Sequence, residues 1–319
     1  MHAKGALPKQ FQDAVDAFQE KVNAKLDSQQ KADEVQQPLY HYTTDEGLKG
    51  IFETEQLWFT GYRFQNDPDE FLYGKQLALE ALDTYAAAAR NTFEKQLIES
   101  VRSILTSDQW DSALDVFLAC FTRKRDDSKQ WETYGDNGRG FAIGFAPQMF
   151  AIEDPAFKTR IDKILCGPVV YDQEKALSRH KEAIGWALDE FLKAARLYPH
   201  LMMPPTNKDA FMKEMRMSLI AQPLIWYSLT AKKHDYHVED EVRQVLLGAG
   251  DDLNPYIQTR DRGSEIVPYV AAPWRVREAG MVDEIIVGPA ASLGAEEDVK
   301  AMLRSYGVDG VKVTRAEFR

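Results

Sequence analysis

The stretch VEDEVRQVLL, residues 238–247, decides the fold because it predicts a strand that runs into the interior of a sheet. It ends in the apolar run VLL, whereas the residues before this run include three carboxylates and an arginine. Alternate side chains of a strand share a face, so Glu239, Glu241 and Arg243 are expected to point the same way. A carboxylate inside a sheet must be paired, and Arg243 is close enough to pair with it. An ordinary Glu–Arg ladder on a solvent-facing strand is the alternative.

Further strands of the same sheet are predicted from short apolar runs bounded by turns. They are Leu39–Thr43, Leu57–Thr60, Val116–Thr122, Gly140–Phe145, a short strand near Tyr171, Ile266–Val270, Glu284–Gly288 and Gly310–Thr314. Helical patterns separate several of these runs. The sequence therefore predicts an α+β protein with a single mixed-sheet domain.

Helical segments lie outside the predicted sheet. Residues 1–37 form an N-terminal arm, in which apolar residues three or four apart give one stripe, and residues 38–319 form the α+β domain. Two helical insertions are expected near 71–115 and 174–222. The apolar stripe of the arm either packs on the domain or makes a homodimer through the N-terminal helix.

Composition limits the partners and the location of the protein. The net charge of −11 disfavours generic attraction to nucleic acid or anionic membrane. Cys120 and Cys166 are not arranged as a CxxC pair, which argues against a disulfide framework or a cysteine zinc site. The N-terminus lacks the apolar region of a secretory signal, and no run is long enough to span a bilayer. A cytoplasmic location without membrane contact is expected.

Two polar segments at the ends of predicted strands are candidates for binding. His41 lies between two tyrosines on the first strand, and together with Tyr42 and Thr43 it suits a ligand with hydroxyl groups and a flat ring. A hydrogen-bonded structural histidine is the alternative. Asn66 and Asp67 begin a turn before a helix, where they either cap the helix or face the same ligand.

A third polar segment separates the strands Val116–Thr122 and Gly140–Phe145. Trp131 and Tyr134 are three residues apart and would share a face of one helical turn. They either cover the edge of the sheet or form a stacking wall, in which case Arg139 would bind phosphate.

The order of these segments resembles a mostly bacterial family, domain-of-unknown-function family 2971. The resemblance covers residues 38–319 and rests on an ordered set of motifs rather than on one decisive motif. The motifs are LYHYT, LWFT, the NDP turn, FLACFT, the W..Y segment, GFAIGF, the E-x-E-x-R strand, EIIVGP and the final Arg319.

A weaker resemblance links the chain to the ADP-ribosyltransferase superfamily. It implies a split sheet in which His41 holds the adenosine ribose of NAD and Glu241 stabilises the oxocarbenium-like centre. An aromatic residue would stack on nicotinamide, and Phe71, Tyr73 or Tyr134 could take this role.

The leading expectation is therefore an NAD-using ADP-ribosyltransferase-like enzyme or NAD glycohydrolase, such as a bacterial effector, toxin or phage-defence protein. NAD would be the substrate, the acceptor a protein or nucleic acid, and no metal is needed. Glu239, Glu241 and Arg243 would be catalytic. One alternative is a module that binds a nucleotide or a partner without turnover. Another is a metal-dependent nuclease using Asp67, Glu239 and Glu241.

Overall fold

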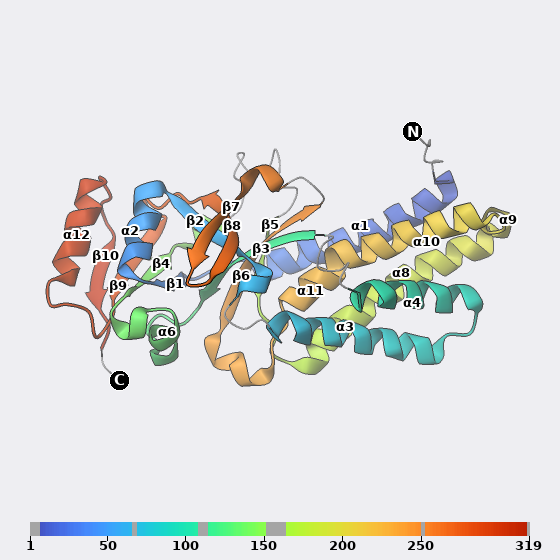
Figure 1. Ribbon diagram of the computed structural model, residues 1–319, viewed down its shortest axis with the longest axis horizontal. Coiled ribbons are helices and arrows are strands. Elements are labelled where there is room, and N and C mark those ends of the chain that lie inside the picture. The colour runs from blue at the N-terminus through green and yellow to red at the C-terminus, as the bar shows by residue number, and fades with distance from the viewer. Residues whose placement is uncertain (1–6, 66–68, 108–113, 151–163, 250–252, 318–319) are drawn as a thin grey trace. The chain divides into compact units, whose positions relative to one another are not determined.

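The structure is a computed structural model that describes residues 7–65, 69–107, 114–150, 164–249 and 253–317 (Figure 1). Its helices and one mixed sheet confirm the predicted α+β class. Contacts divide the chain into two compact units. The helical unit comprises Met1–Ala32, Asp67–Leu114 and Val170–Asp235, and the sheet unit comprises Asp33–Asn66, Asp115–Val169 and Tyr236–Arg319.

Helices from three parts of the chain form the helical unit, in which α1, α8 and α10 run side by side (Figure 1). The helical insertion predicted near 71–115 contains α3 and α4, and Asn91 caps α4 by accepting a hydrogen bond from the backbone N–H of Glu94. The elements are α1 (Lys9–Ala32), α3 (Asp69–Ala88), α4 (Thr92–Leu105), α8 (Gln173–Leu197), α9 (Pro199–Met202), α10 (Pro205–Leu219), the π-helical turn η4 (Ile220–Leu224) and α11 (Ile225–Leu229).

The apolar stripe of α1 is buried within the helical unit. The ring of Phe11 stacks on Phe211 at 4.3 Å between centroids, and Phe191 stacks on Phe211 at 4.8 Å. At the edge of this contact, Lys21 pairs with Glu190 at 2.5 Å. The stripe that could have served a dimer is thus covered by α8 and α10 of the same chain.

A histidine without hydrogen bonds lies inside the helical unit. His180 on α8 is completely buried, and neither ring nitrogen has a hydrogen-bond partner. Its ring meets the edge of Tyr227 at 5.8 Å between centroids. Burial, and next the charge of Arg179, lower the pKa of His180 to about 3. The core of the helical unit therefore holds this imidazole in its neutral form.

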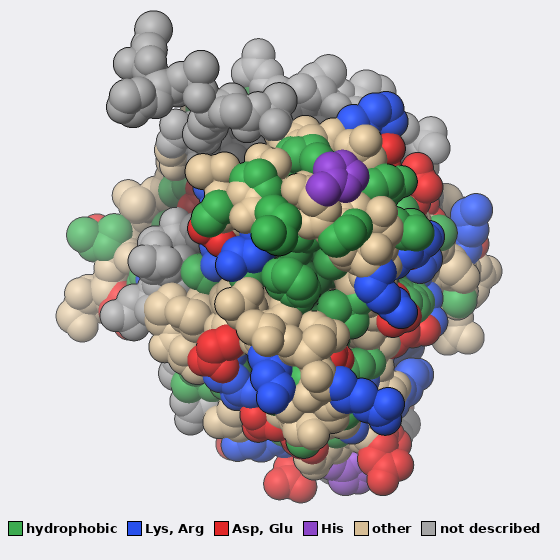
Figure 2. All heavy atoms as spheres, turned by 90° about the vertical axis from the view of Figure 1, so that its right-hand side faces the viewer, with side chains coloured by type: hydrophobic (Ala, Val, Ile, Leu, Met, Phe, Trp, Pro, Cys, Tyr) green, Lys and Arg blue, Asp and Glu red, His purple; other side chains and the backbone are tan. Residues whose placement is uncertain are grey.

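Apolar side chains gather at the α9 end of the helical unit, which Figure 2 views directly. Leu197, at the end of α8, is 61% exposed and Met203, just after α9, is 80% exposed. Within the described residues, no helix is long and apolar enough to cross a membrane.

The sheet unit contains the ten strands of one sheet. The order is β10-β9-β4-β1-β3-β2-β8-β7, while β6 pairs with β3 and β5, and only the β9–β10 pair on this path is parallel. The strands are β1 (Leu39–Thr43), β2 (Gln56–Gly61), β3 (Leu114–Thr122), β4 (Phe141–Phe145), β5 (Ile164–Pro168), β6 (Glu241–Ala249), β7 (Ile257–Arg262), β8 (Glu265–Pro273), β9 (Val282–Val287) and β10 (Lys312–Arg315).

Two predicted strands differ from the observed ones. The strand predicted to start at residue 238 begins at Glu241, because His234–Glu239 forms a 3-10 helix (η5) and Asp240 has a φ of 43°. Glu239 consequently does not lie on the same strand as Glu241. The short strand expected near Tyr171 is absent from the described residues there, where Val170 makes only an isolated bridge.

Both faces of the sheet carry apolar clusters. On one face, Phe52 of α2 (Asp45–Thr54) and Leu303 of α12 (Ala295–Ser305) belong to a large cluster with strand residues such as Ile143. On the other face, Tyr40 and Tyr42 of β1 pack with Trp131 and its neighbours. Strand alternation in LYHYT thus separates the two tyrosines from Leu39, as predicted from the sequence.

The sheet is nearly divided between β1 and β3. Within the described residues, Tyr40–Thr122 is the single registered pair between these strands. By contrast, β1 pairs with β4 over all five of its residues. On the other side of the division, β3 pairs with β2 through Leu118 and Phe117. The stretch of β3 between Leu118 and Thr122 therefore runs from one half of the sheet to the other.

Candidate functional site

A pocket of about 150 Å³ lies at this division, and we call it the split pocket. Its floor is the consecutive stretch Leu118–Thr122 of β3. Residues of β1, β2, η5 and β6, together with the short helix α6 (Ser128–Thr133) and its end, form the walls. All lining residues belong to the sheet unit. Its volume is below the roughly 300–1,000 Å³ of pockets that enclose a drug-sized ligand, so it can enclose only part of a nucleotide.

His41 reaches across the division of the sheet. Its Nδ1 lies 3.1 Å from the carbonyl oxygen of Cys120 on β3, so the protonated Nδ1 donates to this oxygen. Burial lowers the pKa of His41 below its ordinary value, although the bond to Cys120 opposes this effect. A neutral ring that donates through Nδ1 leaves Nε2 as an acceptor. His41 can therefore accept a hydrogen bond from a ligand hydroxyl group.

Glu241 also lines the split pocket and is held by a bidentate ion pair. Arg243 Nε lies 2.6 Å from Glu241 Oε1, and its Nη2 lies 3.0 Å from Oε2. Both residues are buried, at 7% and 4% exposure, so the ion pair fixes the orientation of the carboxylate. Glu239 also lines the split pocket, and its backbone carbonyl accepts a 2.6 Å hydrogen bond from Thr122 Oγ1. The site therefore brings two glutamates close to the division of the sheet.

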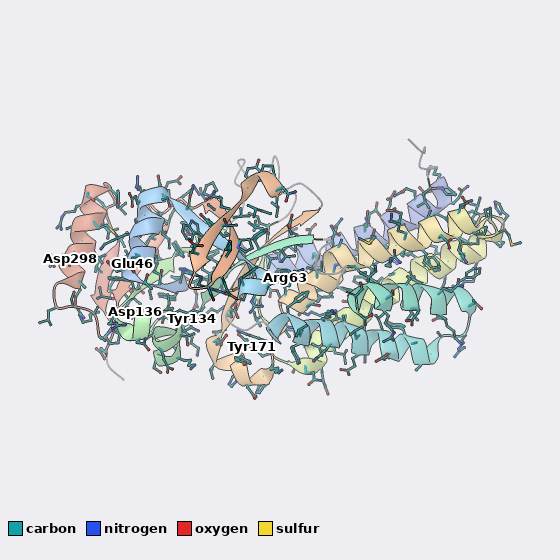
Figure 3. All side chains as sticks on the ribbon, in the orientation of Figure 1. Glu46, Arg63, Tyr134, Asp136, Tyr171 and Asp298 are labelled. Carbon is teal, nitrogen blue, oxygen red and sulfur yellow. The ribbon has the colours of Figure 1, made fainter. Side chains whose placement is uncertain are left out.

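Exposed aromatic rings line the same pocket. Tyr134, which ends α6 and is labelled in Figure 3, is 39% exposed, and Trp58 of β2 is 42% exposed. Trp58 was not among the site residues predicted from the sequence. The alternation in LWFT could have identified Trp58, because it places Leu57 and Phe59 in the core and Trp58 on the other face of the sheet.

Trp131 faces away from the split pocket. Its indole Nε1 donates a 2.7 Å hydrogen bond to Asp126, and its ring meets the edge of Tyr42 at 4.7 Å between centroids. Trp131 is only 4% exposed and lines a different hollow. The helical turn predicted to present Trp131 and Tyr134 together instead ends at Tyr134, so the two rings diverge.

The other predicted residues are distributed more widely. Tyr42 lines the split pocket, and its hydroxyl donates to the carbonyl of Lys124. Thr43 is the last residue of β1 and is not part of the lining. Arg139 pairs with Asp136 at 2.7 Å and borders a separate hollow beside α2 and α12.

Several predicted residues do not belong to the described part of the sheet unit. Phe71 and Tyr73 are on α3 of the helical unit, where Tyr73 packs against Leu77. Asn66, Asp67 and Arg319 lie outside the described residues. The sequence suggested them as ligand contacts, a helix cap or a family motif, and those predictions stay open.

A second arginine-paired carboxylate, Glu284, contacts a lining residue of the split pocket from outside the lining. The hydroxyl of Tyr40, a lining residue, donates to Glu284 Oε1 at 2.9 Å. Arg125 donates to both oxygens of the same carboxylate at 2.7 and 2.6 Å. Burial alone would raise the pKa of Glu284, but the hydrogen bonds from Arg125 and Tyr40 hold it below its ordinary value. Glu284 is not part of the lining, which makes it a matched counterpart of Glu241.

No set of three His, Cys, Asp or Glu residues gathers as a metal site in the part of the chain that the structure describes. The nuclease alternative needed Asp67, whose position is not described, beside Glu239 and Glu241.

The chain was also compared with known proteins. Residues 130–244 match the family described as a protein of unknown function, DUF2971. This match confirms the family resemblance over that segment. The DUF2971 segment begins at Gln130 and contains four lining residues of the split pocket: Gln130, Tyr134, Glu239 and Glu241. Searches of curated proteins and of solved structures gave no match.

Proposed function

We propose that the protein is an NAD-using enzyme of the ADP-ribosyltransferase type, which cleaves NAD and transfers ADP-ribose to an acceptor or to water. One observation carries the proposal. Among the described residues, β1 and β3 are joined by one registered pair, and a pocket lies at this weak junction. His41, which can accept a hydrogen bond, and the ion-paired Glu241 both line that pocket. Exposed aromatic rings beside them suit a flat nicotinamide ring.

The proposed reaction breaks the bond between the ribose C1′ and the nicotinamide nitrogen. The bonding electrons leave with nicotinamide, which becomes neutral, and positive charge develops on the ribose. The carboxylate of Glu241 would stabilise this charge, and Arg243 would keep the carboxylate oriented. An acceptor oxygen or nitrogen then bonds to C1′ and loses its proton to solvent or to a nearby base. Glu239, which lines the same pocket, is the candidate for that base.

The neutral imidazole of His41 would accept a hydrogen bond from a ribose hydroxyl. The pocket volume of about 150 Å³ limits what it can enclose to part of the dinucleotide, so the rest of NAD would extend along the surface of the sheet unit. A protein that consumes NAD or modifies a protein or nucleic acid in this way would suit a role as a bacterial effector, toxin or phage-defence protein.

The decisive experiment incubates the purified protein with NAD labelled in both halves. It follows the release of nicotinamide and the transfer of label to protein or RNA. Glu241→Gln is expected to lower kcat for nicotinamide release about 100-fold, because a charge that acts mainly in the transition state is lost. Glu284→Gln is the matched control: it also removes a buried, arginine-paired carboxylate of the same sheet, but one outside the lining.

Glu241→Gln breaks a pair in which both side chains are buried, which costs about 3–5 kcal/mol, whereas the partner of Glu284 is exposed. Both variants therefore need a folding check by circular dichroism. If the wild type cleaves NAD and Glu241→Gln cleaves it equally fast, Glu241 has no catalytic role. If the wild type releases no nicotinamide at any protein concentration tested, the proposed function is wrong.

A binding module without turnover is the second candidate. Both oxygens of Glu241 already accept hydrogen bonds from Arg243, as in a structural ion pair. Calorimetric binding of NAD to the wild type and to Glu241→Gln, without nicotinamide release from either, would favour this candidate.

A further inference from the structure

An arginine and two aromatic rings form a cluster on the sheet face that holds the split pocket. Arg260 of β7 lies over the ring of Trp58 at 5.0 Å and over the ring of Tyr269 at 6.0 Å. The rings of Trp58 and Tyr269 are themselves 4.4 Å apart between centroids. We call these three residues the Arg260 cluster. Three neighbouring strands supply one residue each, so the sheet itself fixes their arrangement.

Arg260 has no carboxylate partner among the described residues, which is unusual for a half-buried guanidinium in a chain of net charge −11. Its Nε is buried without a hydrogen-bond partner, and its Nη2 makes one long contact of 3.4 Å with Thr60 Oγ1. Burial, and next the charge of Arg262, lower the pKa of Arg260. A cation in this state is stabilised by an anion from outside the described chain.

The next arginine on the same strand shows the contrast. Arg262 donates to Glu265 at 2.9 Å and to the carbonyl of Phe64 at 2.8 Å, so its charge and its donors are satisfied. Arg243 is likewise paired with Glu241. Among the described residues, the lack of a carboxylate partner therefore distinguishes Arg260 from Arg262 and Arg243.

The Arg260 cluster is continuous with the split pocket. Thr60 and Trp58 both line the pocket, and both contact Arg260. Arg260 itself is not part of the lining, so it lies beside the pocket next to β2 residues that form a wall. A ligand with one ring inside the pocket and an anionic group just outside it would reach both places.

We propose that Arg260 binds the diphosphate of a nucleotide whose sugar and ring enter the split pocket, and that Trp58 provides the flat surface beside it. The proposal rests on the proposed function, in which that nucleotide is NAD. A guanidinium fork matches two oxygens of a phosphate, and an exposed tryptophan stacks on a base or shields a ribose. One uncompensated arginine in an acidic protein favours a mononucleotide-sized anion over a nucleic-acid strand, which needs several phosphate contacts.

Calorimetry with ADP and with adenosine tests the proposal without requiring turnover. Wild type is expected to bind ADP and to bind adenosine more weakly. Arg260→Gln is expected to weaken ADP binding about 10- to 100-fold, because a charge-assisted phosphate contact is lost, and to leave adenosine binding unchanged. Arg260→Lys, which keeps the charge but not the fork, should restore part of the loss.

Arg262→Gln is the matched control, since it removes the same charge from the same strand. Equal weakening by Arg262→Gln and Arg260→Gln would show a general charge effect and would overturn the proposal. Wild-type binding of ADP that Arg260→Gln leaves intact would also overturn it, as would binding of a single-stranded oligonucleotide without binding of ADP.

The outcome separates this proposal from the proposed function. If ADP binding depends on Arg260 but NAD is not cleaved, the nucleotide site stands and the enzyme proposal fails. If NAD is cleaved with the same KM in Arg260→Gln as in wild type, the enzyme stands and the role of Arg260 is wrong. Trp58→Ala, which truncates a partly exposed ring, is expected to raise KM for NAD.

Discussion

Replacement of the buried His180 by leucine should remove a strong pH dependence of stability from the helical unit. The folded unit lowers the pKa of His180 to about 3, from 6.5 in the unfolded chain. The unfolded state therefore takes up a proton below about pH 6.5 that the folded state cannot take up until about pH 3. This single group lowers the free energy of unfolding by about 1.4 kcal/mol at about pH 5.5 and by about 2.7 kcal/mol at about pH 4.5. The complete effect, reached below pH 3, is about 5 kcal/mol.

Urea unfolding followed by far-ultraviolet circular dichroism measures this contribution. Other groups also titrate in acid, so the informative quantity is the stability of His180→Leu minus that of wild type at each pH. This difference should grow by about 1.4 kcal/mol between about pH 7.5 and about pH 5.5. His200→Leu, which removes an exposed histidine of the same unit, is the control variant at each pH. A His180→Leu difference that does not change with pH would refute the idea that His180 is buried as a neutral ring.

Three further predictions concern single residues. Because burial lowers the pKa of His41 below its ordinary value of 6.5, any loss of nicotinamide release through protonation of His41 should have its midpoint below pH 6.5, and a pH–rate profile in which His41 titrates above 6.5 would contradict this. Trp131→Phe loses the hydrogen bond to Asp126 and should lower the free energy of unfolding by about 1 kcal/mol in urea titrations, with unchanged ADP affinity. Gly74→Ala would place a Cβ 2.2 Å from the carbonyl oxygen of Ser228, so the free energy of unfolding of the helical unit should fall by about 1–3 kcal/mol or more. A variant with the thermal stability of the wild type would disprove this close approach.

Much of the sheet could be predicted because apolar runs and alternation report burial directly. LYHYT forms β1 with the predicted faces, and the apolar run ending at Thr122 forms β3. β7 was missed because its sequence, IQTRDR, is mostly exposed and has no apolar periodicity. The start of β6 was misjudged because Asp240 adopts a positive φ, which neither charge pattern nor alternation encodes.

The candidate site was harder to predict because it depends on contacts between distant segments. His41 and Glu241 were chosen for polar chemistry in strand contexts, and both line the split pocket. Trp131 was grouped with Tyr134 by spacing alone, but the ring of Trp131 packs in the hydrophobic cluster that contains Tyr42. Glu265, the partner of Arg262, lies three residues away in the sequence. The lack of a carboxylate partner for Arg260 among the described residues depends on side chains of neighbouring strands, which the local sequence does not show.

The lone residue pair between β1 and β3 has a mechanical consequence. A strand junction resists shear in proportion to the hydrogen bonds that must break together, and this junction has one registered pair where β1–β4 has five. The two parts of the sheet are therefore expected to pivot about Tyr40 and Thr122 without either part unfolding. A ligand that contacts both parts of the sheet would reduce this motion between β1 and β3. Slower amide hydrogen exchange along β1 and β3 in the presence of the ligand would show the effect.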